Sequence, residues 1–241
     1  MSYHNIDFRL KRLKRGFLIW ITLISLLINL WLDNIRFTIF QTKSSKKSRV
    51  QIKRAKWFTN QLIKLGSAFI KIGQLLSARP DLIPNTWIQE LSKLQDQVPN
   101  FSFAQVEETI REELGSKFNE IDQIICDPVG SASLAQVHRA TLKDGKKVVF
   151  KVQRPNLKEL FIIDLGIMQQ IAGLLQKNKN WSRGRNWVEI AKECRKVLMK
   201  ELDFNCEAQY AARFRQQFLD DENIEVPEVI WDMSSEKVLC L

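Results

Sequence analysis

The segment from 129 to 153 constrains the fold of this chain more than any other segment. It opens with four small residues at 130–133, and two strand-like stretches then flank Lys143-Asp144-Gly145. Asp-Gly between two such stretches is the strongest short-range signal for a β-hairpin. In a strand over 148–152, side chains alternate between faces, so Val149 and Lys151 share the face opposite the other three residues, which are apolar. The sequence therefore predicts an antiparallel hairpin with a lysine in its second strand.

The same hairpin carries the first candidate functional residues. Small residues let a backbone lie close to a phosphate group, and Lys151 supplies a positive charge on a rigid strand. These two features together are typical of a phosphate-binding site. A solvated strand face that ends in a surface lysine explains the pattern equally well, so the segment alone leaves both interpretations open.

Composition favours a globular protein with free thiols. The 241 residues, 45% of them hydrophobic and 27% charged, are enough for a core and for one or two domains. The four cysteines show no C-x-x-C spacing, and only two histidines are present. A zinc site is therefore not expected, and a reducing compartment is favoured.

The net charge of +10 comes from one end of the chain. Residues 1–64 hold 14 Lys and Arg against two acidic residues, a net charge of +12, whereas the remainder holds 23 against 25, a net charge of −2. The basic residues alternate with a long apolar helix face rather than with base-stacking positions. Nucleic acid is therefore not an expected partner.

Residues 17–32 predict a helix in contact with a membrane. They are apolar apart from Thr22, Ser25 and Asn29, which share one stripe of a helix. Sixteen residues are short for crossing roughly 30 Å of hydrocarbon, and a spanning helix would send one of the two flanking basic clusters to the wrong side. An interfacial helix, with residues 9–56 contacting anionic lipids, is therefore preferred over a true span or a helix packed on the protein. No small-residue cleavage site follows, so signal-peptide removal is not expected.

Helices dominate most of the remaining sequence. Residues 42–49 are polar and predict a linker, and a helix follows up to Leu76. Lys71 and Gln74 lie together on the side of this helix away from its apolar stripe, where a solvated face explains them most simply. Further helices are expected over 86–98, 102–114 (with Ser102 as N-cap and Gly115 as stop), 157–176 and 187–219, and closing strands over 226–231 and 237–241.

Acidic residues late in the chain are candidate partners for the lysines. Asp203 and Glu207, four residues apart on the expected helix, form an unfavourable pair of like charges unless a cation lies between them. A helix carboxylate that follows a strand lysine is also the pairing that positions such a lysine in protein kinases. An exposed acidic face is the alternative interpretation.

Several spaced segments resemble one family, the UbiB-like or aarF-domain-containing atypical kinases. Lys71-Ile72-Gly73-Gln74 resembles the K-x-G-Q motif of that family, and 128–140 resembles the alanine-rich loop that replaces the kinase glycine-rich loop. The other similar segments are 75–84, 90–99, 151–155 and 201–208, with 161–165 and 181–185 similar to members from photosynthetic lineages. The resemblance covers the chain from about residue 55 to its last residue.

The resemblance implies an α+β fold in which a protein-kinase-like small lobe, an antiparallel sheet plus helix C, follows an N-terminal helical extension. It implies three parts: a basic membrane-proximal helix and linker (1–49), a helical K-x-G-Q extension (50–125), and a small lobe with inserted helices (126–241). ATP is the implied cofactor.

The residues implied to act at the catalytic site are Lys151, Glu207, Lys71, Gln74, Glu201 and Asp203. Lys151 is implied to contact the α- and β-phosphates of ATP and to pair with Glu207. Lys71 and Gln74 are implied to reach into the nucleotide site, where Glu201 and Asp203 would hold them. In that position they are implied to exclude a protein substrate.

The residues implied to bind the nucleotide are Val129, Gly130, Ser131, Ala132, Ser133, Val137, Val149 and Lys151. Two of them depart from the usual pattern. Val149 stands where protein kinases usually carry alanine beneath the adenine, which implies a tighter base pocket. Gly130 stands where the family often has alanine, which adds one conformationally permissive position.

In this family a large lobe follows, with the catalytic Asp and the Asn and Asp that hold Mg²⁺. Neither an H-x-D-x-x-x-x-N nor a D-F-G segment occurs in this sequence. The Mg²⁺ ligands are therefore expected only in a missing large lobe, supplied for example by a separate polypeptide, and this chain alone is not expected to transfer phosphoryl groups.

The expected function is the ATP-binding half of a membrane-associated UbiB-like kinase or ATPase linked to isoprenoid-quinone or lipid metabolism. Its expected location is the cytoplasmic or plastid stromal face of a membrane. A non-catalytic membrane adaptor or pseudokinase fragment is the alternative.

Overall fold

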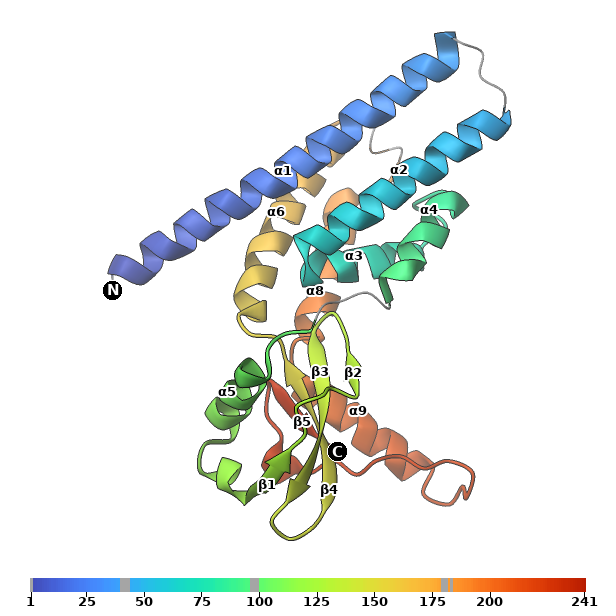
Figure 1. The fold of residues 1–241 in the computed structure, drawn as a ribbon. Helices are drawn as coiled ribbons and strands as arrows, with labels where there is room; N and C mark the ends of the chain where they lie inside the picture. The colour runs from blue at the N-terminus through green and yellow to red at the C-terminus, as the bar shows by residue number, and fades with distance from the viewer. Residues whose placement is uncertain (1, 40–43, 96–99, 179–181, 183) are drawn as a thin grey trace. The chain divides into compact units, whose positions relative to one another are not determined.

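The structure, a computed structural model, describes residues 2–39, 44–95, 100–178, 182 and 184–241. The chain forms two compact units, which Figure 1 shows as ribbons. The helical unit comprises Met1–Gln97 and Leu160–Lys192, and the sheet unit comprises Val98–Glu159 and Glu193–Leu241. Helix α5 (Phe103–Leu114) belongs to the sheet unit, and most of α6 (Leu157–Lys177) belongs to the helical unit. The boundaries of these two units therefore differ from those of the three predicted parts.

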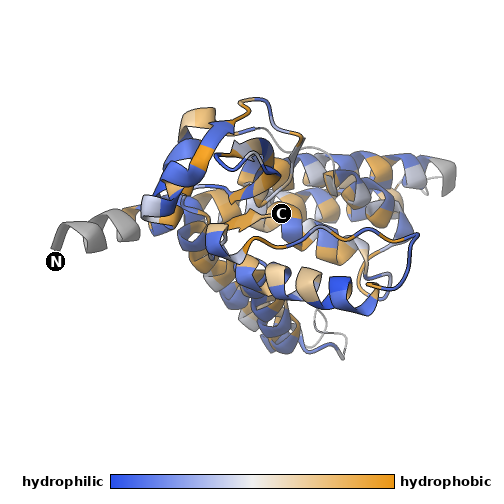
Figure 2. Cartoon of the chain, turned by 90° about the horizontal axis from the view of Figure 1, so that it is seen from below, coloured by the Kyte–Doolittle hydropathy of each residue, from blue (hydrophilic) through white to orange (hydrophobic). Residues whose placement is uncertain are grey.

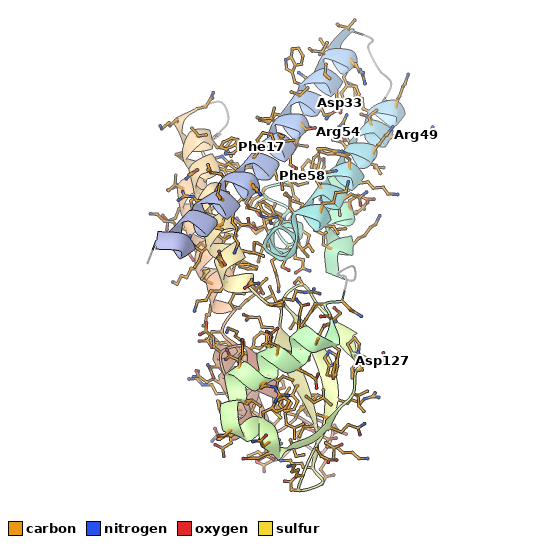
Figure 3. All side chains as sticks on the ribbon, turned by 60° about the vertical axis from the view of Figure 1, so that its left-hand side comes forward. Phe17, Asp33, Arg49, Arg54, Phe58 and Asp127 are labelled. Atoms are coloured by element: carbon orange, nitrogen blue, oxygen red, sulfur yellow. The ribbon has the colours of Figure 1, made fainter. Side chains whose placement is uncertain are left out.

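The helical unit also contains α1 (Ser2–Ile39), α2 (Ser44–Leu65), α3 (Ser67–Ser77), α4 (Asn85–Leu91), the 3₁₀ turn η1 (Ser92–Gln95) and the first turns of α8 (Trp187–Lys200). Helices α1 and α2 run side by side (Figures 1 and 3). Figure 2 shows hydrophobic and hydrophilic residues interspersed along the helices.

Three predictions for this part of the chain differ from the structure. Of the linker predicted over 42–49, residues 44–49 are helical, because α2 already begins at Ser44, and 42–43 lie outside the described residues. The helix predicted to run up to Leu76 is interrupted at Gly66, whose φ of 89° is a conformation that glycine adopts without steric cost. Of the helix predicted over 86–98, α4 ends at Leu91, a 3₁₀ turn covers Ser92–Gln95, and 96–98 lie outside the described residues.

The buried side of α1 is the side that carries its polar stripe. Ile19, Leu26 and Asp33, spaced seven residues apart, are buried against the helical unit. Arg15, on the same side, donates from Nε and a terminal nitrogen to the buried Asp164 of α6, both at 2.7 Å. The broad apolar side of α1 therefore faces outward, away from the helical unit.

The sheet unit contains α5, the 3₁₀ turn η2 (Gly115–Glu120), β1 (Ile121–Ile124), β2 (Gly130–Ser131), β3 (Ala135–Leu142), β4 (Lys147–Gln153), α9 (Phe204–Gln217), the 3₁₀ turn η3 (Trp231–Met233) and β5 (Val238–Cys240). The strands form an antiparallel sheet in the order β1-β3-β4-β5, and β2 pairs with β3. The predicted hairpin is confirmed, with Val137 opposite Lys151 and Gly145 at φ 85° in the turn.

Each face of the sheet is covered by one helix of this unit. On one face, Val106 and Ile110 of α5 pack against Phe150, Val152 and Cys240. Helix α5 has the predicted ends, since a capping box at its N-terminus links Ser102 with Gln105 and Gly115 follows its last turn. On the other face, α9 packs against Ala135 and Leu239. The alternation predicted for β4 is therefore confirmed, because Val149 and Lys151 lie on the α9 side.

Two predictions near the end of the chain are wrong. The helix expected over 187–219 is divided into α8 and α9, because Asp203 has an extended backbone and caps α9. The strand expected over 226–231 does not form, and Pro227 gives a reason, since proline has no N–H group to donate to a sheet. Ile230 N still donates to Cys240 O at 3.0 Å, so this segment lies against β5 without forming a strand.

Candidate functional site

Lys151 and Glu207 form an ion pair between β4 and α9, on the face of the sheet that α9 covers. The Lys151 Nζ atom lies 2.5 and 2.6 Å from the two carboxylate oxygens of Glu207, which is one turn inside α9. The ring of Phe204 lies 5.1 Å from the same Nζ atom and adds a cation–π contact. The two side chains are 27% and 47% exposed, so an anionic ligand can reach the lysine. The helix carboxylate thus holds the strand lysine in one orientation.

Asp203 has a different role from the one predicted by the helical spacing. Its side chain accepts a hydrogen bond from Asn205 N at 3.0 Å and so caps the N-terminus of α9. A carboxylate at this position satisfies a free N–H group and interacts favourably with the helix dipole. Asp203 therefore precedes the helix instead of lying one turn before Glu207 on it, and the cation expected near the two carboxylates contacts Glu207, where it is Lys151.

The loop of small residues folds back tightly on β3. Val129 N donates to Val137 O at 2.7 Å, and Ala132 N donates to Ala135 O at 2.8 Å. Ser133 is buried in the turn between β2 and β3. The start of the loop and Lys151 thus flank Val137 from the two neighbours of β3, and their predicted role in phosphate binding stays a prediction.

Arg154 ties this loop to the end of β4. Its guanidinium donates to Ala132 O at 3.2 and 3.1 Å and to Ser131 Oγ at 3.2 Å, and it lies 5.3 Å from the ring of Phe101. Its backbone N–H also donates to Leu134 O at 2.9 Å. Burial lowers the pKa of Arg154, although an arginine keeps its charge at neutral pH. The sequence prediction assigned Arg154 no role, and its place directly after the lysine strand is the signal that could have suggested one.

Gln153 is a second residue that the sequence prediction missed. It is buried, and its Nε2 atom donates to Leu202 O at 2.7 Å. Leu202 lies between Glu201 and Asp203, so this bond fixes the backbone of the E-x-D motif to β4. The signal available in the sequence was a polar glutamine directly after the alternating stretch 148–152, because buried polar side chains usually have a hydrogen-bond partner.

Replacing Arg154 by alanine is expected to loosen the loop over 130–134. The loss of several hydrogen bonds from one charged group should cost about 1–3 kcal/mol of unfolding free energy, and amide hydrogen exchange in the loop should accelerate. A matched control is Lys158→Ala, which removes an exposed ion pair with Glu236 at 2.7 Å and should cost less than about 1 kcal/mol. Unchanged exchange at 130–134 in Arg154→Ala would show that another contact holds the loop.

The K-x-G-Q residues lie on α3 of the helical unit. Gln74 Nε2 donates to Leu94 O at 3.1 Å, so this side chain is not part of a simple solvated face. Gly73 is buried beneath Leu62, Leu91 and Leu94. The pairing of Lys71 and Gln74 with the acidic residues of the E-x-D motif stays a prediction.

A hollow of about 820 Å³ lies in the sheet unit, on the face that carries Val149. Its size lies in the range of small-molecule sites. Val149 and Leu241 line it, and the backbone groups of these two residues bond each other at 2.9 and 3.1 Å. Of the residues predicted to bind nucleotide, Val149 lines the hollow, whereas Lys151 lies two residues further along the same face and the loop lies outside it.

Comparison with known proteins gives the family. The ABC1 atypical kinase-like domain matches residues 93–241. The protein ACTIVITY OF BC1 COMPLEX KINASE 7, chloroplastic, of Arabidopsis thaliana is 42% identical over 235 residues, which are 95% of this chain and 33% of that protein. An uncharacterized protein of Synechocystis is 42% identical over 228 residues, 92% of this chain and 38% of its own length. A probable protein kinase UbiB of Marinobacter nauticus is 40% identical over 183 residues, 75% of this chain and 33% of its own length.

A solved structure is similar as well. The complex of Rv3197 with erythromycin from Mycobacterium tuberculosis matches with a TM-score of 0.52 and 28% sequence identity, over 83% of this chain and 50% of that chain. This chain spans about a third of the length of the curated relatives named above. The predicted α+β fold with a kinase-like small lobe is thereby confirmed, and the chain belongs to the ABC1/UbiB family of atypical kinases.

Proposed function

We propose that this chain is the nucleotide-binding part of a membrane-associated atypical kinase or ATPase that acts in isoprenoid-quinone or other lipid metabolism. The observation that carries the proposal is the Lys151–Glu207 ion pair, which holds a strand lysine beside a tight loop of small residues. Membership of a kinase-like family supports nucleotide binding in general. The chloroplastic relative from Arabidopsis supports a plastid setting.

ATP fits the residues of the sheet unit. Lys151 supplies a positive charge for the α- and β-phosphates in this proposal, and Glu207 orients the lysine. Val149 offers an apolar surface to the base in the hollow. For Mg²⁺, the part of the chain that the structure describes offers no cluster of three or more His, Cys, Asp or Glu side chains that could hold the ion. We propose that its ligands come from the large lobe found in the family.

The test is a calorimetric titration with Mg-ATP. The sheet unit supplies one wall of a cleft and leaves most of the adenine base exposed to water. We therefore expect a Kd no better than about 1 mM, which corresponds to a binding free energy of about −4 kcal/mol. Lys151→Ala should weaken binding at least tenfold, whereas Lys143→Ala in the exposed hairpin turn should leave it unchanged. Equal affinity in wild type and Lys151→Ala would contradict the proposal, and micromolar binding lost in Lys151→Ala would show a stronger half-site than we expect.

The outward side of α1 supports membrane association. Leu13, Phe17, Ile21, Ile24 and Ile28 are large, exposed and spaced three or four residues apart, as on one helix face. By length and composition, 10–39 could cross a membrane. Ion pairs to α2 and α6 hold the opposite side of α1 on the protein, however, and α2 is rich in lysine and arginine. These contacts favour a helix that lies in the interface, with its basic neighbours near anionic headgroups.

Vesicle flotation tests this part of the proposal. We expect the protein to float with anionic vesicles, less with zwitterionic ones, and less at high salt. The double variant Phe17→Glu, Ile24→Glu should stay in solution. The control double variant Leu174→Glu, Leu219→Glu makes the same charge change at two exposed leucines outside α1 and should still float. Resistance of the wild type to alkaline carbonate extraction would favour a true span instead.

A further inference from the structure

The helical unit contains a second, partly open cavity of about 640 Å³, lined by other residues than those proposed to bind the nucleotide. Lining residues run along α1 from Leu26 to Phe37, a length of about 16 Å at 1.5 Å per residue. Aromatic rings from α2, α4 and α8 form much of the remaining wall: Phe58, Trp87 and Trp187. An elongated and largely apolar cavity with few polar groups is typical of a small-molecule site.

The lining of this cavity includes a largely buried ion pair. Asp33 of α1 is only 5% exposed, and its Oδ2 atom accepts from Nε and a terminal nitrogen of Arg54 at 3.0 and 2.9 Å. Figure 3 shows the two residues beside each other between α1 and α2, with Phe58 further along α2. Both charged residues line the cavity.

The second oxygen of Asp33 lacks a partner. Among the residues that the structure describes, no donor bonds the buried Oδ1 atom. A buried carboxylate oxygen without a hydrogen bond is costly, so a donor is expected there. Oδ1 has almost no accessible surface in this structure. Asp33 lines the cavity, so a rotation of its carboxylate that exposes Oδ1 would let a ligand in the cavity bring that donor.

The charges restrict the kind of donor. Arg54 already neutralises Asp33, so a cationic head group would leave an unbalanced positive charge in an apolar site. An anionic head group would meet the carboxylate oxygen with a like charge and has no proton to donate. A hydroxyl group is neutral and donates one hydrogen bond, which satisfies both conditions.

We propose that this cavity, lined by Asp33, Arg54, Phe37, Phe58, Trp87 and Trp187, binds a single-chain lipid alcohol, with its hydroxyl donating to Asp33 and its apolar chain lying along α1. The residues that line this cavity belong to the helical unit and Lys151 belongs to the sheet unit, so this inference stands whether or not the sheet unit binds ATP. Water at Asp33 in an otherwise unliganded cavity is the competing possibility.

The test is a calorimetric titration of the whole chain with 1-decanol and with decanoate. We expect saturable binding of one decanol per chain and at least tenfold weaker binding of decanoate, since decanoate lacks the donor and carries a charge. Equal affinity for the two compounds, or no saturable binding of decanol, would overturn the proposal.

Matched variants separate the cavity from the outward side of α1. Leu30 lines the cavity and Leu27 does not, although the two are similarly exposed, at 40% and 42%. Leu30→Trp should weaken decanol binding at least tenfold, whereas Leu27→Trp should change it less than twofold. Equal effects in the two variants would mean that decanol adsorbs to the helix surface. The decanol and decanoate comparison on the wild type remains decisive if Leu30→Trp does not fold.

Discussion

Arg15→Ala is expected to destabilise the helical unit by about 3–5 kcal/mol, because it leaves a buried carboxylate without its partner. Asp164 is only 1% exposed, and Arg15 holds both of its oxygens at 2.7 Å. The same arginine donates to Leu65 O and lies 5.8 Å from the ring of Phe69. Denaturant unfolding followed by circular dichroism measures the loss.

The stability lost in Arg15→Ala should increase as the pH is raised. Burial raises the pKa of Asp164, and Arg15 opposes that rise. Without Arg15 the pKa rises further, so the folded variant binds more protons than the unfolded chain from about pH 4 up to the raised pKa. Stability of the variant therefore falls as pH increases through this window, and the gap to wild type should be larger at pH 7 than at pH 4.5.

The double variant Arg15→Met, Asp164→Leu is the control for this interpretation. It removes both charges and keeps an apolar contact, so it should recover most of the stability lost in Arg15→Ala. A gap that is the same at both pH values, or a double variant as unstable as the single one, would mean that lost packing rather than the unpaired carboxylate causes the effect.

Gly73→Ala should destabilise the protein by about 1–3 kcal/mol, whereas Gly166→Ala should stabilise it by up to about 1 kcal/mol. A Cβ atom at Gly73 would lie 2.3 Å from Leu94 Cδ1 and 2.9 Å from Leu62 Cδ1, and both leucines are buried in the packed core. A Cβ atom at Gly166 meets no atom within 4 Å. Thermal unfolding of the two variants in parallel compares the same substitution in helices of the same unit.

The two alanine variants should change stability in opposite directions because Gly73, the glycine of the K-x-G-Q motif, lies against other side chains and Gly166 does not. Gly73 lets α3 approach η1 closely, which is the approach that brings the Gln74 side chain to Leu94 O. Gly73→Val, with a larger side chain, should therefore lose more stability than Gly73→Ala. Two alanine variants of equal stability would show that the leucines move aside at little cost.

The sequence by itself determined the features that depend on neighbouring residues. The β3–β4 hairpin follows from Lys143-Asp144-Gly145 and the alternation after it, and α5 follows from Ser102 and Gly115. Local signals of this kind act over a few residues, so they can be recognised without the fold. The pairing of Lys151 with Glu207, 56 positions apart, was predicted from analogy with protein kinases and from the family resemblance, not from local sequence signals.

The tertiary structure decided the features that depend on distant contacts. Arg15 and Asp164 are 149 positions apart, and neither residue carries a local sign of the other. The same holds for Asp33 and Arg54 across α1 and α2, and for the cavity that they line. The polar stripe of α1 was visible in the sequence, but only the packing of α1 on α2 and α6 turned that stripe inward. Burial of a charged side chain depends on which partner the fold brings to it, and periodicity alone does not contain that information.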